Sequence, residues 1–261
     1  MILIDSHCHL DRLNYKKIKK SLDEILYKSE KKYVKYILNV STSIKNFEAM
    51  TKFIGNRKNI FYACGIHPFY YQKNIKTKEI IKKFKNKNVI AVGEIGLDYS
   101  NKNVVKKKKQ KQMFLKQIKI SEKLQKPIIV HTRNSIKDTI KILKKKKIKK
   151  NSGVIHSFNE TNIKYIKKIL DLNFYISISG IITFKNAEKL RKIIEYIPLE
   201  KLLIETDSPY LTPEPKRGKE NEPCNLYYIA KKISEIKKIK LVKMSNIIRK
   251  NFQKLFKVKI K

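Results

Sequence analysis

The sequence predicts an α/β protein that folds as a single (β/α)8 TIM barrel. Two observations lead to this prediction. The chain has 261 residues, close to the roughly 250 residues that one such barrel typically needs. Eight short apolar segments alternate along it with lysine-rich segments of helical periodicity, and this alternation is the pattern of a parallel barrel. We therefore expect one domain over residues 1–261.

The apolar segments are short and rich in β-branched residues, as strands are. Residues 114–125 and 163–172 illustrate the segments between them, in which apolar side chains recur at helical spacing. In chain order, the predicted strands are residues 2–7, 36–41, 60–67, 89–96, 127–132, 153–158, 174–179 and 202–207.

Two connections are expected to be loops. Residues 98–112 follow the fourth strand and contain the four consecutive lysines Lys106–Lys109. Residues 208–225 follow the eighth strand and hold four of the chain's seven prolines. We therefore expect this second loop to be stiff and shaped, with one or two helices after it.

The composition predicts the cytoplasm as the compartment. No apolar run approaches the roughly 18 residues of a membrane span. The N-terminal segment MILIDSHCHL lacks the basic start and long apolar stretch of a secretory leader. Three cysteines without a CxxC pair are typical of a reducing compartment. We expect neither a membrane association nor an obligate protein partner.

The formal net charge of +40 has two explanations. A strongly basic surface indicates a polyanionic partner such as nucleic acid. Only six of the 62 basic residues are Arg, however, although Arg is the side chain whose planar fork matches phosphate. Lys, Ile and Asn, which have A/T-rich codons, are abundant, so we attribute the charge mainly to codon composition. A charge of this size still attracts nucleic acid at low salt.

All five histidines lie at the C-terminal ends of predicted strands, where (β/α)8 barrels carry their active sites. One histidine alone is more often a packed or surface residue, but five scattered ones would rarely all fall there. They are residues 7, 9, 67, 131 and 156.

His7 and His9 are two residues apart on the first predicted strand, so their imidazoles point to the same face. Asp5 shares that face and could orient one of the two histidines from behind. Cys8 points the other way, and we expect it to pack in the core.

Two carboxylates are expected at the same end of the barrel, Glu94 on the fourth strand and Asp207 on the eighth. With the histidines of the first, fifth and sixth strands they make four imidazoles and two carboxylates, more ligands than one zinc-like ion takes. Two ions about 3.5–4 Å apart, bridged by a carboxylate and a hydroxide, would use the whole set. The sequence thus predicts two divalent metal cations per chain, without choosing among Mg, Mn and Zn.

In these motifs the chain resembles the TatD family of metal-dependent hydrolases, within the wider group of amidohydrolase-like barrels. The resemblance extends from Ile4 to about Phe256. Its motifs are DSHCHLD (5–11), CGIHP (64–68), VGEIGLDY (92–99), HTRNSIKD (131–138), IHSF (155–158), YISISGIITFKNA (175–187), ETDSPYLTPEP (205–215) and RGKENEP (217–223).

The resemblance implies a metal-dependent hydrolase type of barrel with two metal sites that share Glu94 as a bridge. The ligands of the first site would be His7, His9, Glu94 and Asp207. Those of the second would be Glu94, His131 and His156. After His156 the chain has SFNET where the family usually has a short Ser/Gly turn, so this loop differs locally.

Three further residues are expected to bind substrate. His67 resembles a histidine that the family carries near the metals, and Arg133 and Arg217 could each hold a phosphate. The alternatives are a packed histidine and two structural ion pairs. Asp98 is interpreted as a carboxylate that shapes its loop, and Asn221 as a residue that shapes the loop after the eighth strand.

Two bridged cations would lower the pKa of a bound water, with Asp207 and Glu94 as the catalytic carboxylates. GxSxG and P-loop motifs are absent from the sequence. Similarity to TatD relatives favours a nuclease with 3′–5′ exodeoxyribonuclease-like phosphodiester hydrolysis, whose substrate is DNA. A D-aminoacyl-tRNA deacylase and a small-molecule amidohydrolase are the alternatives. A basic nucleic-acid-binding protein without catalysis is disfavoured by the complete ligand set.

Overall fold

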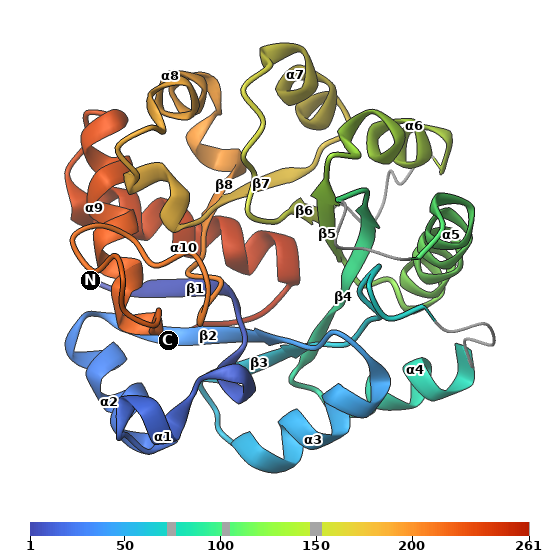
Figure 1. Cartoon of the computed structure of the whole chain (residues 1–261), viewed down its shortest axis with the longest axis horizontal. Coiled ribbons are helices and arrows are strands. Elements are labelled where there is room, and N and C mark those ends of the chain that lie inside the picture. The colour runs from blue at the N-terminus through green and yellow to red at the C-terminus, as the bar shows by residue number, and fades with distance from the viewer. Residues whose placement is uncertain (72–76, 101–104, 147–152, 261) are drawn as a thin grey trace.

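Eight parallel strands form a nearly closed barrel that helices surround, as predicted (Figure 1). The computed structural model describes residues 1–71, 77–100, 105–146 and 153–260. The strands follow one another around the barrel in chain order. They are β1 Leu3–Cys8, β2 Val34–Val40, β3 Ile60–Ala63, β4 Val89–Asp98, β5 Ile128–Arg133, β6 Gly153–Ile155, β7 Tyr175–Ile178 and β8 Leu202–Ile204.

The helices alternate with the strands and cover the outside of the barrel (Figure 1). The α-helices are α1 Tyr15–Ile18, α2 Leu22–Lys31, α3 Ile44–Ile54, α4 Thr77–Lys83, α5 Lys107–Leu124, α6 Ile136–Lys146, α7 Ile163–Asp171, α8 Glu188–Tyr196, α9 Leu226–Ile236 and α10 Leu241–Phe256. Short 3-10 turns are η1 Leu10–Arg12, η2 Gly180–Thr183, η3 Leu199–Lys201 and η4 Pro223–Asn225. Within the described ranges, no helix has the length and hydropathy needed to cross a membrane.

The barrel has a seam between its first and last strands. Successive strands from β1 to β8 are joined by backbone ladders, whereas β8 and β1 are not. Two backbone hydrogen bonds near the ends of the two strands join them instead. The Asp207 amide donates to the His7 carbonyl at 2.9 Å, and the His9 amide donates to the Ser208 carbonyl at 2.8 Å.

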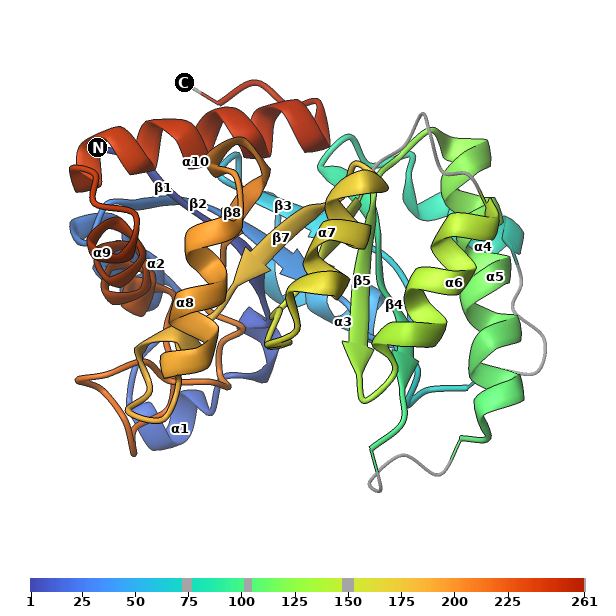
Figure 2. The same ribbon diagram turned by 90° about the horizontal axis from the view of Figure 1, so that it is seen from above.

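Helix α10 lies across the end of the barrel at which the strands begin (Figure 2). Its Asn251 donates hydrogen bonds to the carbonyls of Leu199 and Leu202, where β8 starts. The opposite end, where the strands finish, is called the mouth below. Because α10 covers the other end, a site at the C-terminal ends of the strands is reached from the mouth.

The structure corrects the predicted ends of three strands. The third, sixth and eighth end at Ala63, Ile155 and Ile204, three or four residues earlier than predicted. Two of the residues that follow, Ser157 and Asp207, have positive φ angles of 44° and 55°, which extended strands do not adopt. The chain therefore turns at the mouth, and side chains there no longer follow the two-residue alternation of a strand.

Helix α5 also begins earlier than its periodic segment predicts, at Lys107 rather than near residue 114. Three of the four lysines of Lys106–Lys109 thus lie in its first turn instead of in a loop. All four side chains are exposed. Because the helix follows β4, this electropositive N-terminus lies at the mouth.

Candidate metal centre

The structure brings all five histidines together at the mouth, a group called the histidine cluster below. His7 belongs to β1, and His9 is the first residue after that strand. Both side chains are buried, and their Nε2 atoms face each other at 3.3 Å. Nδ1 of His9 lies 2.8 Å from the Val40 carbonyl, to which only a protonated Nδ1 can donate. In the neutral tautomer that makes this hydrogen bond, Nε2 of His9 carries no proton and points into the cluster.

Glu94 lies at the centre of the cluster because β4 packs very closely on β5. A Cβ atom at Gly96 would come within 2.0 Å of the His131 carbonyl oxygen, and one at Gly93 within 2.6 Å of the Ile129 side chain. Only glycine permits this approach at either position. The close packing places the neighbouring Glu94 side chain directly beside the imidazole of His131.

The two oxygens of Glu94 face different imidazoles. Oε1 lies 2.7 Å from His131 Nδ1 and 2.9 Å from His156 Nε2. Oε2 lies 3.7 Å from His7 Nε2. The carboxylate therefore stands between the β1 histidines and the histidines of β5 and β6, in the position that a bridging ligand requires.

Two buried carboxylates hold the outer nitrogens of the second pair of imidazoles. Asp98 Oδ2 lies 3.0 Å from His131 Nε2. Glu205 Oε1 lies 3.2 Å from His156 Nδ1 and accepts the Ser157 amide at 2.6 Å. Such carboxylate–histidine pairs fix the orientation of metal-binding imidazoles and make them better ligands.

Asp207 faces the first pair of imidazoles from the loop after β8. Its Oδ1 lies 3.6 Å from His9 Nε2 and 3.8 Å from His7 Nε2. Asn221 holds this loop by donating to the carbonyls of Thr206 and Tyr210, which is the shaping role predicted for it. Asp207 is the more exposed of the two central carboxylates, at 13% against 5% for Glu94.

His67 lies at the edge of the cluster, with Nε2 3.5 Å from Glu94 Oε1. Its Nδ1 accepts the amide of Phe69 at 3.1 Å, so in the neutral ring the proton is on Nε2. His67 is near enough to Glu94 and His131 to be a third ligand there. The proton on Nε2 makes it instead a hydrogen-bond donor on the side of the ring that faces Glu94.

Burial and mutual proximity shift the pKa values of the cluster strongly. Burial lowers the pKa of His7 well below its ordinary value and that of His67 to about 3, so both rings are neutral at pH 7. Burial alone would raise the pKa of Glu94, but the imidazoles of His67 and His156 outweigh it and hold that pKa far down. Burial would lower the pKa of His156, but Glu94 and Glu205 raise it well above its usual range.

These contacts test whether the residues fit a metal. Imidazole nitrogens face each other at 3.2–3.3 Å in both pairs, around one ionised carboxylate. Burial would lower the pKa of His131 and of His156, but Asp98 and Glu94 raise that of His131, and Glu94 and Glu205 raise that of His156. Imidazoles that bind a cation give up their protons at the binding nitrogen. Two of the groupings able to hold an ion are His7–His9–Glu94 and His7–His156–Glu205. The donor set, mainly imidazole and carboxylate, suits a divalent cation.

Three further residues singled out in the sequence lie outside the histidine cluster. Asp5 contacts no imidazole; it accepts the backbone amides of His7 and Thr206 instead, because it points to the β8 side. Cys8 is buried, as predicted. Arg133 is exposed at the end of β5, and its guanidinium has no hydrogen-bond or ion-pair partner among the described residues.

Arg217 is exposed in the loop after β8 and lies over the Phe184 ring at 4.1 Å from the ring centroid. It also donates to the Thr212 carbonyl at 3.2 Å. Its part in substrate binding stays a prediction.

Sequence reasoning missed Glu205 and Arg12. Glu205 is a carboxylate within the otherwise apolar segment LLIETD, and an acidic residue in a buried segment was an available signal. Arg12 directly follows the motif DSHCHLD, and nothing in the sequence showed that its side chain turns toward the mouth.

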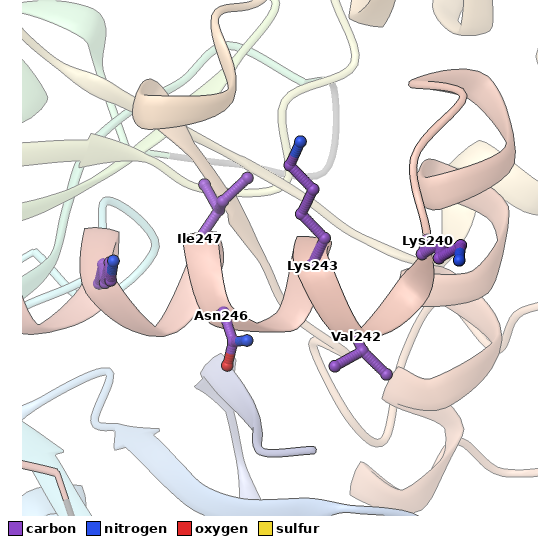
Figure 3. A pocket seen from close by; sticks show the side chains of 6 residues that line it. Lys240, Val242, Lys243, Asn246 and Ile247 are labelled. Carbon is purple, nitrogen blue, oxygen red and sulfur yellow. The ribbon is translucent and has the colours of Figure 1, made fainter.

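A surface hollow of about 490 Å³ lies away from the mouth, on α10 at the closed end of the barrel (Figure 3). Its position separates it from the histidine cluster. It is lined by Lys240, Val242, Lys243, Asn246, Ile247 and Lys250.

Sequence comparison identifies relatives over nearly the whole chain. The model of a family described as "TatD related DNase" matches residues 4–257. An "uncharacterized metal-dependent hydrolase" of Buchnera aphidicola is 47% identical over 257 residues, which cover 98% of this chain and 96% of the relative. The metal-dependent hydrolase YcfH of Escherichia coli is 40% identical over 258 residues, covering 99% and 97%.

Solved structures share the same barrel. The TatD homologue YJJV of Escherichia coli superposes with a TM-score of 0.89 at 25% identity, covering 98% of both chains. A phosphotriesterase homology protein of Escherichia coli, solved with phosphate in its active site, superposes with a TM-score of 0.69 at 12% identity, covering 97% and 98%. The second likeness concerns the fold alone.

Proposed function

Because the chain belongs to the TatD family of metal-dependent hydrolases, we propose that it is a nuclease. The reaction would be phosphodiester hydrolysis of the 3′–5′ exodeoxyribonuclease type, at a centre that holds two divalent cations. The description of the matching family as related to DNases supports this proposal.

One observation of the mouth carries the nucleic-acid part of the proposal. Two lysines beside the cluster make cation–π contacts with tyrosine rings. Lys107 Nζ lies 4.7 Å above the Tyr99 ring, and Lys109 Nζ lies 5.0 Å above the Tyr71 ring. A cationic rim that contains partly exposed aromatic side chains is the kind of surface that single-stranded nucleic acids contact.

The ligands proposed for the first cation are His7, His9, Glu94 and Asp207, and those for the second are Glu94, His131 and His156. Glu94 would bridge, because its two oxygens face the two imidazole pairs separately. Cations in these positions supply Lewis acidity, which polarises a phosphoryl oxygen and promotes ionisation of water.

The chain's own side chains would accept and donate protons and would position the phosphate. Oδ1 of Asp207 faces the imidazoles of His7 and His9, which leaves Oδ2 to accept the proton of the attacking water. The Nε2 proton of His67 would be donated to a non-bridging phosphoryl oxygen. The exposed guanidinium of Arg133 would bind a neighbouring phosphate, since a planar guanidinium matches two phosphate oxygens.

The experiment compares three substrates with one enzyme preparation. End-labelled single-stranded DNA, D-aminoacyl-tRNA and a chromogenic phosphodiester are each incubated with the protein and Mg²⁺ or Mn²⁺. We expect stepwise shortening of the DNA from one end. Glu94→Gln purified in parallel is the matched control, because a contaminating nuclease would survive in that preparation.

The other outcomes are equally definite. Release of the amino acid from D-aminoacyl-tRNA with intact DNA would replace the nuclease by a deacylase. Hydrolysis of the chromogenic diester alone would indicate a small-molecule substrate.

A further inference from the structure

Arg12 lies at the mouth and has no anionic partner in the part of the chain that the structure describes. It ends the turn η1, directly after β1, and its side chain is half-buried. Its guanidinium donates to two neutral hydroxyls, those of Thr42 and, at 3.4 Å, Tyr210. Among the described residues, no carboxylate lies within ion-pair distance of it. A partly desolvated guanidinium held by neutral groups is a strong attractor for an anion.

Two tyrosine rings flank this guanidinium. Tyr210 comes from the loop after β8, and Tyr70 comes from the loop after β3, with its hydroxyl also near Arg12. Their rings lie beside the histidine cluster, at centroid distances of 6.2 Å from Tyr210 to His9 and 6.4 Å from Tyr70 to His67. The three side chains therefore reach one spot from three separate loops.

The rings are not covered by the protein. Tyr210 is 47% exposed and Tyr70 is 45% exposed, and the neighbouring Phe69 is 37% exposed. Tyrosine packed only for stability would bury more of its ring, because the buried area is what stabilises the fold. Exposed rings beside an unpaired cation instead offer a stacking surface and a phosphate contact together.

We propose that Arg12, Tyr70 and Tyr210 form a nucleotide subsite, in which Arg12 binds a phosphate and the tyrosines stack on the adjoining base. The occupant is the nucleotide next to the bond that is cleaved, and the proposal rests on the proposed nuclease function. Charge favours this occupant, because the mouth also carries the exposed Lys106–Lys109. An uncharged planar ligand would leave Arg12 unpaired.

The test is a double-mutant cycle, in which the tyrosine rings of the protein and the terminal base of the oligonucleotide are removed separately and together. Binding is measured by fluorescence anisotropy, with the metal-loaded full chain and a short phosphorothioate oligonucleotide that resists hydrolysis. A second oligonucleotide lacks the base of its terminal nucleotide. The proteins are the wild type, Tyr70→Leu/Tyr210→Leu, Arg12→Gln and Arg12→Lys. Tyr196→Leu is the control, because Tyr196 is an exposed tyrosine at the end of α8, before β8 begins.

We expect removal of the base to weaken binding to the wild type and to Tyr196→Leu by about tenfold or more, the usual range for stacking on an aromatic ring. The double tyrosine variant should bind both oligonucleotides equally. Arg12→Gln should weaken binding of both and reduce the salt dependence by about one released counterion. Arg12→Lys should restore the salt dependence, because it keeps the charge.

Two results would overturn the proposal. They show whether the subsite alone or the nuclease function as well has failed. An equal effect of base removal in the wild type and the double tyrosine variant would refute the subsite and leave the nuclease function standing. A wild-type protein that neither binds nor cleaves any oligonucleotide, yet hydrolyses a chromogenic diester, would refute both.

Discussion

The Asp98 carboxylate lies 3.0 Å from His131 Nε2, on the side of the ring opposite Glu94. This contact fixes the ring so that Nδ1 faces the centre of the cluster. Burial would raise the pKa of Asp98, but hydrogen bonds from His131 and Ser100 lower it to about 2. Asp98 is therefore ionised at pH 7, and it would act on a cation bound by the cluster through His131.

Asp98→Asn should weaken metal binding by about 10- to 100-fold, the usual cost of losing such a partner. The neutral amide removes the charge that makes His131 a better ligand. The measurement is a chelator competition that gives the metal dissociation constant. Asp138→Asn is the matched control, because Asp138 is a surface carboxylate paired with Lys111. An unchanged constant in Asp98→Asn would show that the residue only shapes its loop.

Glu94→Gln should lower kcat by orders of magnitude. A bridging carboxylate holds two ions at a fixed spacing, and a neutral amide bridges them poorly. If Glu94 were only an ion-pair partner, the rate should fall by less than about tenfold, or roughly 1.4 kcal/mol of barrier. Steady-state rates on a chromogenic phosphodiester distinguish the two cases.

His7→Ala/His9→Ala should abolish turnover and lower the metal content while leaving the fold intact, because a barrel core does not depend on its mouth. The reconstituted wild type is expected to hold about two ions per chain. Elemental analysis and circular dichroism of the double variant check both points. Full metal content together with normal activity would contradict the ligand assignment.

Replacing Lys106–Lys109 with Gln should raise KM for an oligonucleotide and flatten its salt dependence, because fewer counterions are released on binding. Lys144→Gln/Lys145→Gln is the comparison, since these exposed lysines lie near the end of α6, toward the closed end of the barrel. They belong to a second lysine run, 144–147, of which residue 147 lies outside the described residues. Equal effects would mean that the charge acts as a diffuse cloud.

Glu222→Gln should destabilise the fold at pH 7 but not in acid. Burial would raise the pKa of Glu222, but hydrogen bonds from Lys28 and Lys20 outweigh it and lower that pKa. A lowered carboxyl pKa contributes stability above the unfolded value of about 4.3, and this is lost as the pH falls through the folded value. Denaturant unfolding should show a difference of about 1 kcal/mol at most, because the ammonium groups are partly solvated.

The strands and the gathering of the histidines could be predicted because both follow from simple periodicity. Apolar runs mark the strands, and parallel strands all finish at one end of the barrel. Side chains beyond the strand ends could not be placed in this way. Arg217 covers Phe184, because a turn decides its direction. Within β1, Asp5 contacts backbone amides rather than an imidazole, next to an irregularity in the pairing of β1 with β2. Glu205 was missed because a strand pattern says nothing about which buried carboxylate meets which imidazole.

The seam between β8 and β1 has a consequence for how the molecule assembles. Its bonds join residues at opposite ends of the sequence, such as Thr206 and Asp5, which are 201 positions apart. Contacts this distant form late, because the loop between them must first be ordered. His7 and Glu94 come from the first half of the chain, whereas His131 and Asp207 come from the second. Neither half alone can therefore build the centre, and a chain cut between β4 and β5 would regain it only when the two fragments reassociate.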